Sequence, residues 1–181
     1  MLLCFGGEME EIEFDRVDFA SAGAIGAPGS RTFMIQGFQG KARVAVLVER
    51  HQIELLSDQS IEFLDSLMSE FPNEEYATPI QFDQAAEVYE ISPEFRARSM
   101  GLVFDPDTLL ITLELHELPF DPDEDVIDQF MEEEKIVKLT MTRQQLRAMA
   151  VKGREAIEDG RETCILCQAP LDEHEICPRL N

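Results

Sequence analysis

The clearest pattern in the chain predicts a β-hairpin in its first third. Valines recur at every second position between residues 42 and 49, which is the period of a strand with one buried face. Residues 32–36 are also rich in strand-forming types, and residues 37–40 begin and end with glycine. Glycine at such positions is typical of a tight turn between antiparallel strands. The sequence therefore predicts two paired strands joined by a turn at 37–40.

After this hairpin the apolar period lengthens, which predicts a helix over residues 50–71. Ile53, Leu56 and Leu67 fall on one face of that helix, as expected when one side packs on a core. Pro72 follows, and proline ends a helix because it lacks the amide donor that the ladder needs.

A capping signal marks the start of a second helix. Thr142 is followed three residues later by Gln145, and this pair satisfies free backbone amides at a helix N-terminus. Apolar residues then continue at helical spacing, and Gly160 suits the C-terminal end. We expect this helix to run from residue 143 to residue 159.

Several short alternating stretches predict further strands, at 85–91, 96–104, 109–118 and 135–141, and at 11–20 with an irregularity near Asp15 and Arg16. The sequence Asp-Pro-Asp-Thr at 105–108 predicts a turn between two of them. The chain is therefore expected to be an α+β protein, with a mainly antiparallel sheet of six or seven strands packed against two helices.

Two histidines fall within these predicted elements. His51 lies at the entrance of the first helix, where a solvated or capping role is expected. His116 alternates with apolar neighbours in a strand and shares the polar face of that strand with Glu114. We expect both histidines to be exposed and to have no part in catalysis.

Composition and charge narrow the possible partners. Lys and Arg number 15 against 37 Asp and Glu, which gives a net charge of −22. Such a surface repels phosphate backbones, so we expect neither nucleic acid nor an anionic membrane as a partner. An unknown protein partner, preferably a basic one, stays open. The densest acidic run, residues 121–134, lacks the glycine that a calcium loop requires, and a solvated loop is expected there.

The apolar start of the chain, residues 1–5, is too short for a signal peptide, and acids follow it at once. No apolar run approaches the roughly 18 residues that a transmembrane helix needs. Three of the four cysteines gather near the C-terminus, rather than being spread in pairs as in a secreted disulfide scaffold. A cytoplasmic location is therefore expected.

A glycine-rich stretch at residues 21–31 is one candidate binding site. Gly23, Gly26 and Gly29 recur at every third position, and Arg31 follows. Backbone amides in such loops cradle phosphate when a helix comes next. Here a predicted strand follows and no P-loop lysine is present, so a plain turn is the favoured interpretation. The alternative is an anion site formed by Gly26, Gly29 and Arg31, since an arginine can pair bidentately with a phosphate or carboxylate.

The strongest chemical signal lies at the C-terminus. Cys164 and Cys167 are separated by two residues, as are His174 and Cys177, in the pattern C-x2-C-x6-H-x2-C. Three thiolates and one imidazole at this spacing are typical of a tetrahedral zinc site. Because four protein ligands leave no open position, the site is expected to be structural rather than catalytic.

Two other interpretations of these cysteines are less favoured. A redox C-x2-C motif normally follows a strand and opens a helix, whereas this pair follows a predicted helix and precedes Pro170. In the second interpretation Cys4 replaces His174 as the fourth metal ligand, which requires the N-terminus to lie close to the tail.

Zinc knuckles that bind single-stranded nucleic acid use basic and aromatic side chains. After Arg161 this tail offers only Arg179 and no aromatic residue.

Several stretches of the chain resemble an uncharacterised bacterial family, a domain of unknown function with a zinc-ribbon-like tail. The matching stretches are 26–33, 49–56, 94–107, 139–142 and 160–181. In the family's tail, proline follows the first cysteine and glycine follows the second, where this chain has Ile165 and Gln168. All four presumed ligands are kept. The resemblance implies no established activity, and gene neighbours of phosphatase-like and kinase-like types imply only a phosphate-linked context.

The sequence therefore predicts a core domain at 1–160 and a zinc-knuckle tail at 161–181. The leading hypothesis is a cytoplasmic binding or adaptor protein with structural zinc, since no nucleophile motif is present. The rival hypothesis is an enzyme or ligand-binding protein for a phosphorylated small molecule, with Arg31 at the site. A homo-oligomeric scaffold is a third.

Overall fold

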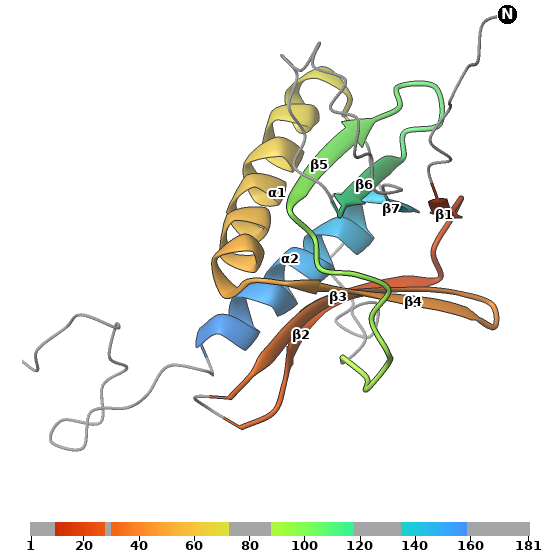
Figure 1. Ribbon diagram of the computed structural model, residues 1–181. Coiled ribbons are helices and arrows are strands. Elements are labelled where there is room, and N and C mark those ends of the chain that lie inside the picture. Colours follow the sequence, from red (N-terminus) through yellow and green to blue (C-terminus); the bar gives the residue numbers. More distant parts are fainter. Residues whose placement is uncertain (1–9, 28–29, 73–87, 118–134, 159–181) are drawn as a thin grey trace, which may run out of the picture.

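The computed structural model describes residues 10–27, 30–72, 88–117 and 135–158, which form two β-sheets and two helices (Figure 1). The elements in chain order are β1 (Glu10–Phe14), β2 (Phe19–Ile25), β3 (Thr32–Gln39), β4 (Ala42–Val48), α1 (Arg50–Glu70), β5 (Ser99–Phe104), β6 (Ile111–His116), β7 (Lys135–Met141) and α2 (Arg143–Glu158). The predicted α+β class is confirmed. The seven strands, however, divide between two sheets rather than forming one.

The first sheet has the order β2-β3-β4 and is antiparallel throughout. Its β3–β4 hairpin is the predicted one, but Gly37 lies inside β3 and the turn falls at residues 40–41. The predicted glycine-rich loop is also shorter than expected, because β2 continues through Gly23 to Ile25. Strand β2 pairs with β3 along its whole length, so only residues after Ile25 are left to form the connection.

The second sheet has the order β1-β7-β6-β5. Its β5–β6 and β6–β7 pairs are antiparallel, whereas β1 runs parallel to β7. The predicted strand at 11–20 is therefore wrong in extent, since β1 ends at Phe14 and β2 begins at Phe19 in the other sheet. Between them, the Val17 amide donates to the Thr140 carbonyl at 2.9 Å, and the Asp18 amide donates to the Phe38 carbonyl at 2.7 Å. This short connection ties the two sheets together.

The turn between β5 and β6 is formed by the Asp-Pro-Asp-Thr sequence at 105–108, as predicted. Thr108 Oγ1 donates to Asp105 Oδ2 at 2.7 Å, and the Asp107 amide donates to Asp105 Oδ1 at 2.9 Å. The hydrogen bond from Thr108 is the main cause that holds the pKa of Asp105 below its ordinary value, and the hydrogen bond from the Asp107 amide is the next. The aspartate therefore stays ionised and keeps the turn closed.

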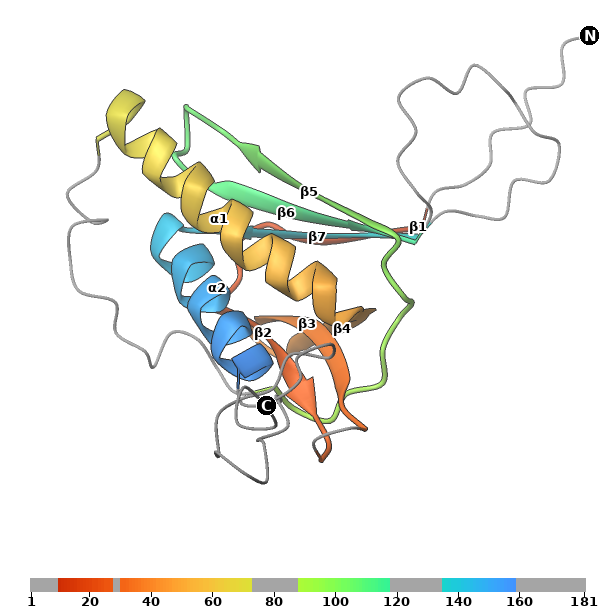
Figure 2. The same cartoon turned by 90° about the vertical axis from the view of Figure 1, so that its left-hand side faces the viewer.

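Both helices lie on one side of the sheets and pack against each other (Figures 1 and 2). Helix α2 begins as predicted, because the Thr142 amide donates to Gln145 Oε1 at 2.9 Å and the Gln145 amide donates to Thr142 Oγ1 at 3.2 Å. Gln145 Nε2 also donates to the Val17 carbonyl at 3.0 Å. The capping residue thus fixes the helix to the connection between the sheets.

The hydrophobic core fills the space between the helices and the sheets. Alternate residues of β6 and β7, among them Leu113, Leu115 and Leu139, are fully buried against Ile53 and Leu64 of α1 and their neighbours. This arrangement explains the sequence pattern, since a strand with one covered face buries every second side chain.

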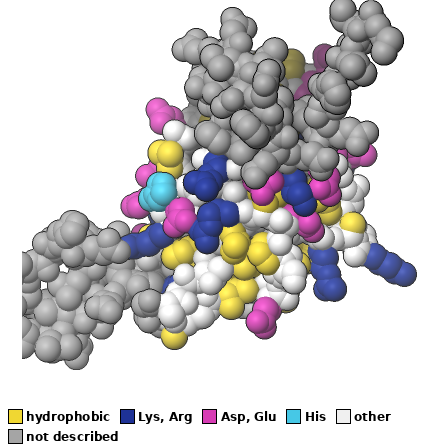
Figure 3. Space-filling view, viewed as in Figure 1, with side chains coloured by type: hydrophobic (Ala, Val, Ile, Leu, Met, Phe, Trp, Pro, Cys, Tyr) yellow, Lys and Arg dark blue, Asp and Glu magenta, His cyan; other side chains and the backbone are white. Residues whose placement is uncertain are grey.

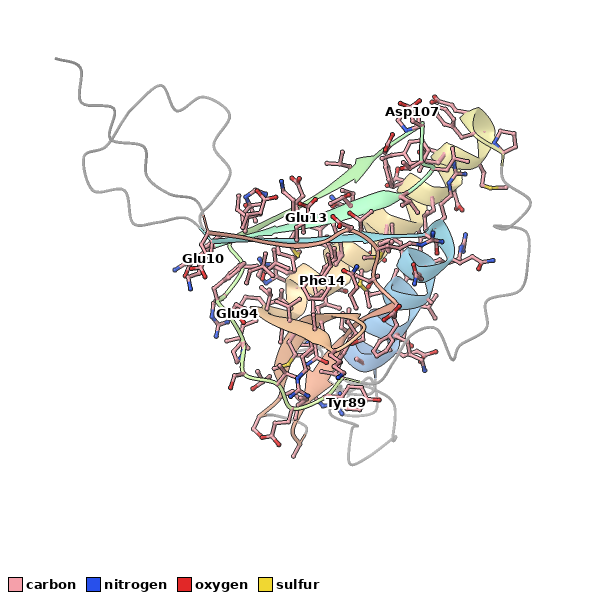
Figure 4. The ribbon with its side chains drawn as sticks, turned by 90° about the vertical axis from the view of Figure 1, so that its right-hand side faces the viewer. Glu10, Glu13, Phe14, Tyr89, Glu94 and Asp107 are labelled. Atoms are coloured by element: carbon pink, nitrogen blue, oxygen red, sulfur yellow. The ribbon has the colours of Figure 1, made fainter. Side chains whose placement is uncertain are left out.

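The chain crosses from one sheet to the other through residues 88–98. The prediction of a strand at 85–91 is not confirmed, because residues 88–91 are not in a strand and 85–87 lie outside the described residues. Buried Gln36 holds this segment, accepting from the Tyr89 amide at 2.9 Å and donating to the Tyr89 carbonyl at 2.5 Å. Further along, the Ala97 amide donates to the Leu47 carbonyl at 2.8 Å. Figure 4 labels Tyr89 and Glu94 along this crossing.

Gly153 allows the two helices to approach closely. A Cβ at this position would lie 2.9 Å from Ile53 Cγ2 and 3.0 Å from Ser57 Oγ of α1. Alanine in place of glycine normally favours a helix by about 1 kcal/mol, but overpacking a buried contact costs about 1–3 kcal/mol. We expect the packing cost to prevail, so that Gly153→Ala lowers the free energy of unfolding measured in urea. Gly101→Ala is the control, because a Cβ there would meet no atom within 4 Å. A more stable Gly153→Ala protein would contradict this prediction.

Candidate functional site

The predicted zinc ligands Cys164, Cys167, His174 and Cys177 lie outside the described residues, and so does Cys4. Across the four described ranges, no three His, Cys, Asp or Glu side chains are grouped so that they could hold a metal ion. The zinc site in the tail, and the division of the chain at residue 160, therefore stay predictions. Over the same ranges, no helix is both long and apolar enough to cross a membrane.

The glycine-rich turn is described in part, since Gly29 falls outside the described residues. Gly26 has a positive φ of 110°, and a Cβ there would lie 2.8 Å from the Ser30 carbonyl oxygen. Only glycine fits this tight connection between β2 and β3 without strain. The half-buried Arg31 side chain turns toward the end of α2, where its Nη1 donates to the Ala156 carbonyl at 2.9 Å. Arg31 thus binds a carbonyl of the last helical turn, and its predicted role in an anion site stays untested.

This contact gives a prediction that separates the two roles of Arg31. Replacing it with methionine keeps much of the apolar stem but removes a charged hydrogen bond to the negative end of the α2 dipole. We expect Arg31→Met to lower the free energy of unfolding by about 1–3 kcal/mol, with or without phosphate. If inorganic phosphate or a nucleotide instead raises the melting temperature of the native protein and not that of Arg31→Met, the anion site is favoured.

A groove of about 390 Å³ lies between α1 and β5. Its walls combine apolar side chains of both elements with a few polar ones: His51, Gln52, Leu55, Leu56, Gln59 and Phe63 from α1, and residues 98–102 from β5 and the position before it. The volume lies within the range of about 300–1,000 Å³ that is usual for ligand sites. His51, predicted as a solvated residue of the helix entrance, is exposed as expected but also lines this groove.

Contacts at each end of α1 tie the helix to the β5 side of the groove. At its N-terminal end, Gln52 Nε2 donates to the Ala97 carbonyl at 3.3 Å, and Glu49 is paired with Arg96. At the other end, the Phe71 and Phe104 rings are 5.1 Å apart, and the buried Arg143 guanidinium lies 5.1 Å from the Phe104 ring centre. Arg143 also donates to the Phe71 carbonyl at 2.5 Å. These anchors hold both walls of the groove in place.

The outer face of the second sheet carries a network of charges. Lys138 Nζ lies 2.7 Å from Glu11 Oε1 and 4.0 Å from Glu114 Oε1, and His116 Nε2 lies 3.6 Å from Glu114 Oε2. The alternation predicted for His116 and Glu114 is confirmed, but the His116 side chain is only 15% exposed. The hydrogen bond to Glu11 is the main cause that raises the pKa of Lys138. Lys138 is therefore fully protonated near neutral pH and serves as a cation rather than as a base or nucleophile.

A similar pair lies at the start of β1. Lys135 Nζ is 3.1 Å from Glu10 Oε2, and this hydrogen bond is the main cause that raises the pKa of Lys135, with smaller effects from Glu117 and Glu94. Figure 4 labels Glu10 and Glu13 on β1, and Glu94 on the segment that precedes β5. The two lysines of β7 thus hold acids of the parallel edge strand β1 from opposite faces of the sheet, since residues 135 and 138 alternate in direction, and both pairs have a structural role.

Sequence reasoning missed the groove because its two walls are far apart in the chain. The one available signal was Leu55, an apolar residue outside the predicted buried stripe of the first helix, which is 52% exposed. A large exposed apolar residue beside an edge strand is informative only after the two elements are placed together.

The comparisons with known proteins identify a family and nothing closer. The model of a family described as "Protein of unknown function (DUF3090)" matches residues 12–177. Neither the curated proteins nor the solved structures contain a match. The matched range includes both walls of the groove and all four predicted zinc ligands.

Proposed function

Because the chain belongs to the family of proteins of unknown function DUF3090, whose description assigns no activity, we propose its role from its own residues: a cytoplasmic binding or adaptor protein that carries a structural zinc ion. The observation that carries this proposal is the C-x2-C-x6-H-x2-C tail. Three thiolates and one imidazole fill a tetrahedral zinc site and leave no position for a reacting water. Zinc would then contribute the free energy that folds the tail.

A binding role also agrees with what the described residues offer. The pKa values of Lys135 and Lys138 are both raised, because each lysine pairs with a glutamate. Both lysines are therefore unsuited to base catalysis. The groove between α1 and β5 is largely apolar and open to solvent at Leu55, as expected of a surface that receives a partner. The absence of a nucleophile motif and the closed ligand set both favour binding over catalysis.

The proposal has a direct test in two measurements on the full chain purified without added metal. Elemental analysis should find about one zinc per chain, and less than about half an equivalent would refute the metal site. Crosslinking in cells followed by mass spectrometry should then recover a specific protein partner. Full zinc occupancy with no partner would leave a zinc protein without the adaptor role.

A further inference from the structure

Strand β5 forms an open edge of its sheet. In the order β1-β7-β6-β5 it has a neighbour only on the β6 side among the described strands. The Asp105 amide donates to the Leu110 carbonyl at 3.0 Å, and hydrogen-bonded pairs of an antiparallel ladder recur at every second residue. Residues 99, 101 and 103 therefore bond to β6, while Met100, Leu102 and Phe104 direct their amides and carbonyls to the open edge. An edge of this kind is a template for another strand.

The groove lies directly along this edge. Met100 and Leu102 share their face of the sheet with buried Leu115 and Leu113 of β6, so their side chains lie on the helix side and form part of the groove. Leu55 and Phe63 of α1 form the opposite wall. A strand added to β5 would direct every second side chain between these walls, because side chains alternate between the two faces of a sheet.

The ionisable side chains that line the groove favour some incoming peptide strands over others. Its ionisable side chains are Arg98 and His51, both exposed, and no acidic side chain is among the described residues that line it. This contrasts with a chain that carries 37 acids against 15 Lys and Arg. Figure 3 shows a histidine and several Lys or Arg side chains, with Asp or Glu side chains beside them, on the face viewed in Figure 1. A carboxylate on the incoming strand would meet the Arg98 guanidinium at this end of the groove, where the His51 imidazole offers a further hydrogen-bonding group.

We propose that the groove between α1 and β5 binds an extended peptide segment of a protein partner by strand addition to β5. The segment carries apolar side chains at alternate positions and a carboxylate at the end that meets Arg98 and His51. This inference rests on the proposed binding function and names its partner class. Backbone hydrogen bonds to β5 supply affinity, and the apolar walls with Arg98 and His51 supply selectivity.

A second copy of the chain is a poorer occupant. Pairing β5 of one copy with β5 of another would bring together two strands whose Met100 and Leu102 side chains already face the helices of their own copy. Neither strand then has free side chains to fill the other's groove. Two chains of net charge −22 also repel each other.

The test measures binding of fluorescein-labelled, seven-residue peptides to the full chain by anisotropy. The probe peptides alternate valine with threonine and carry one aspartate, at the first position in one peptide and at the last in the other. Control peptides replace aspartate with asparagine, or carry N-methyl groups at alternate amides. We expect one aspartate peptide to bind, and both changes to weaken it at least about tenfold, or about 1.4 kcal/mol.

Two surface variants test the location. Leu55→Glu places a carboxylate in the groove, and Arg98→Glu reverses the charge at its end. Both side chains are exposed, so folding should be retained, as circular dichroism would verify. Each should weaken the aspartate peptide at least about tenfold. Arg43→Glu, an equal charge change at an exposed position of β4 outside the groove, should leave binding unchanged.

Three results would overturn the inference: no binding of either peptide, equal binding of the N-methyl peptide, or binding that both groove variants leave intact. A change of oligomeric state in Leu55→Glu without loss of peptide binding would point to a second copy instead. None of these results alters the zinc content or the crosslinked partner, so failure of the groove remains distinct from failure of the adaptor role.

Discussion

Replacing Cys167 with serine is expected to reduce tightly held zinc from about one equivalent per chain to well below half. Structural zinc sites of this type bind with an apparent free energy of about 10–16 kcal/mol at neutral pH. Loss of one thiolate from a closed four-ligand set removes a large share of that energy, since serine's hydroxyl is a poor ligand. We expect the zinc affinity to fall more than about 100-fold, because replacing even a residue that only hydrogen-bonds to a metal ligand costs about 10–100-fold. Competition with a chromogenic chelator would measure it.

Cys4→Ser is the matched control for this experiment. It removes a thiol from the same chain but leaves the C-x2-C-x6-H-x2-C set complete. Zinc content and affinity should equal those of the native protein. If instead Cys4→Ser loses zinc and His174→Ala keeps it, Cys4 rather than His174 completes the site. If neither Cys167→Ser nor Cys177→Ser changes the metal content, the tail does not hold zinc.

The sequence predicted best where short-range patterns decide the structure. The capping pair Thr142 and Gln145 placed the start of α2, and the alternation of β7 placed both ends of that strand. These features depend on residues three or fewer apart, whose spacing alone determines which side chains and amides meet.

The division into two sheets was not predictable in the same way. The apolar residues from Ile12 to Phe19 predicted one strand with an irregularity near Asp15, but the parallel partner of β1 is β7, more than a hundred residues later. The Gln145 side chain that fixes the connection at Val17 is equally distant. The groove could not be predicted for the same reason, since only the fold brings Leu55 and Leu102 together. Long-range pairings leave almost no trace in local periodicity.

Gly37→Ala is expected to destabilise the protein by overpacking the contact between its two sheets. Gly37 lies in β3, and a Cβ there would clash with Leu139 Cδ2 of β7 and lie 3.2 Å from its Cδ1. Leu139 is fully buried, so its side chain has little room to turn away. The absence of a side chain at Gly37 is thus what lets the two sheets meet. We expect a loss of about 1–3 kcal/mol in the free energy of unfolding, measured with urea.

A double-mutant cycle tests whether this contact is the cause. Leu139→Ala alone should cost about 2–5 kcal/mol, because it leaves a cavity in the core. In the double variant the new methyl group at position 37 enters that cavity, so the combined loss should fall short of the sum by about 1 kcal/mol or more. Pairing Gly37→Ala with Leu64→Ala, a fully buried residue of α1, should give a loss within about 0.5 kcal/mol of the sum. If the Gly37→Ala and Leu139→Ala losses are also additive, the new methyl group at position 37 does not press on Leu139. The requirement for glycine at position 37 must then come from the strand itself.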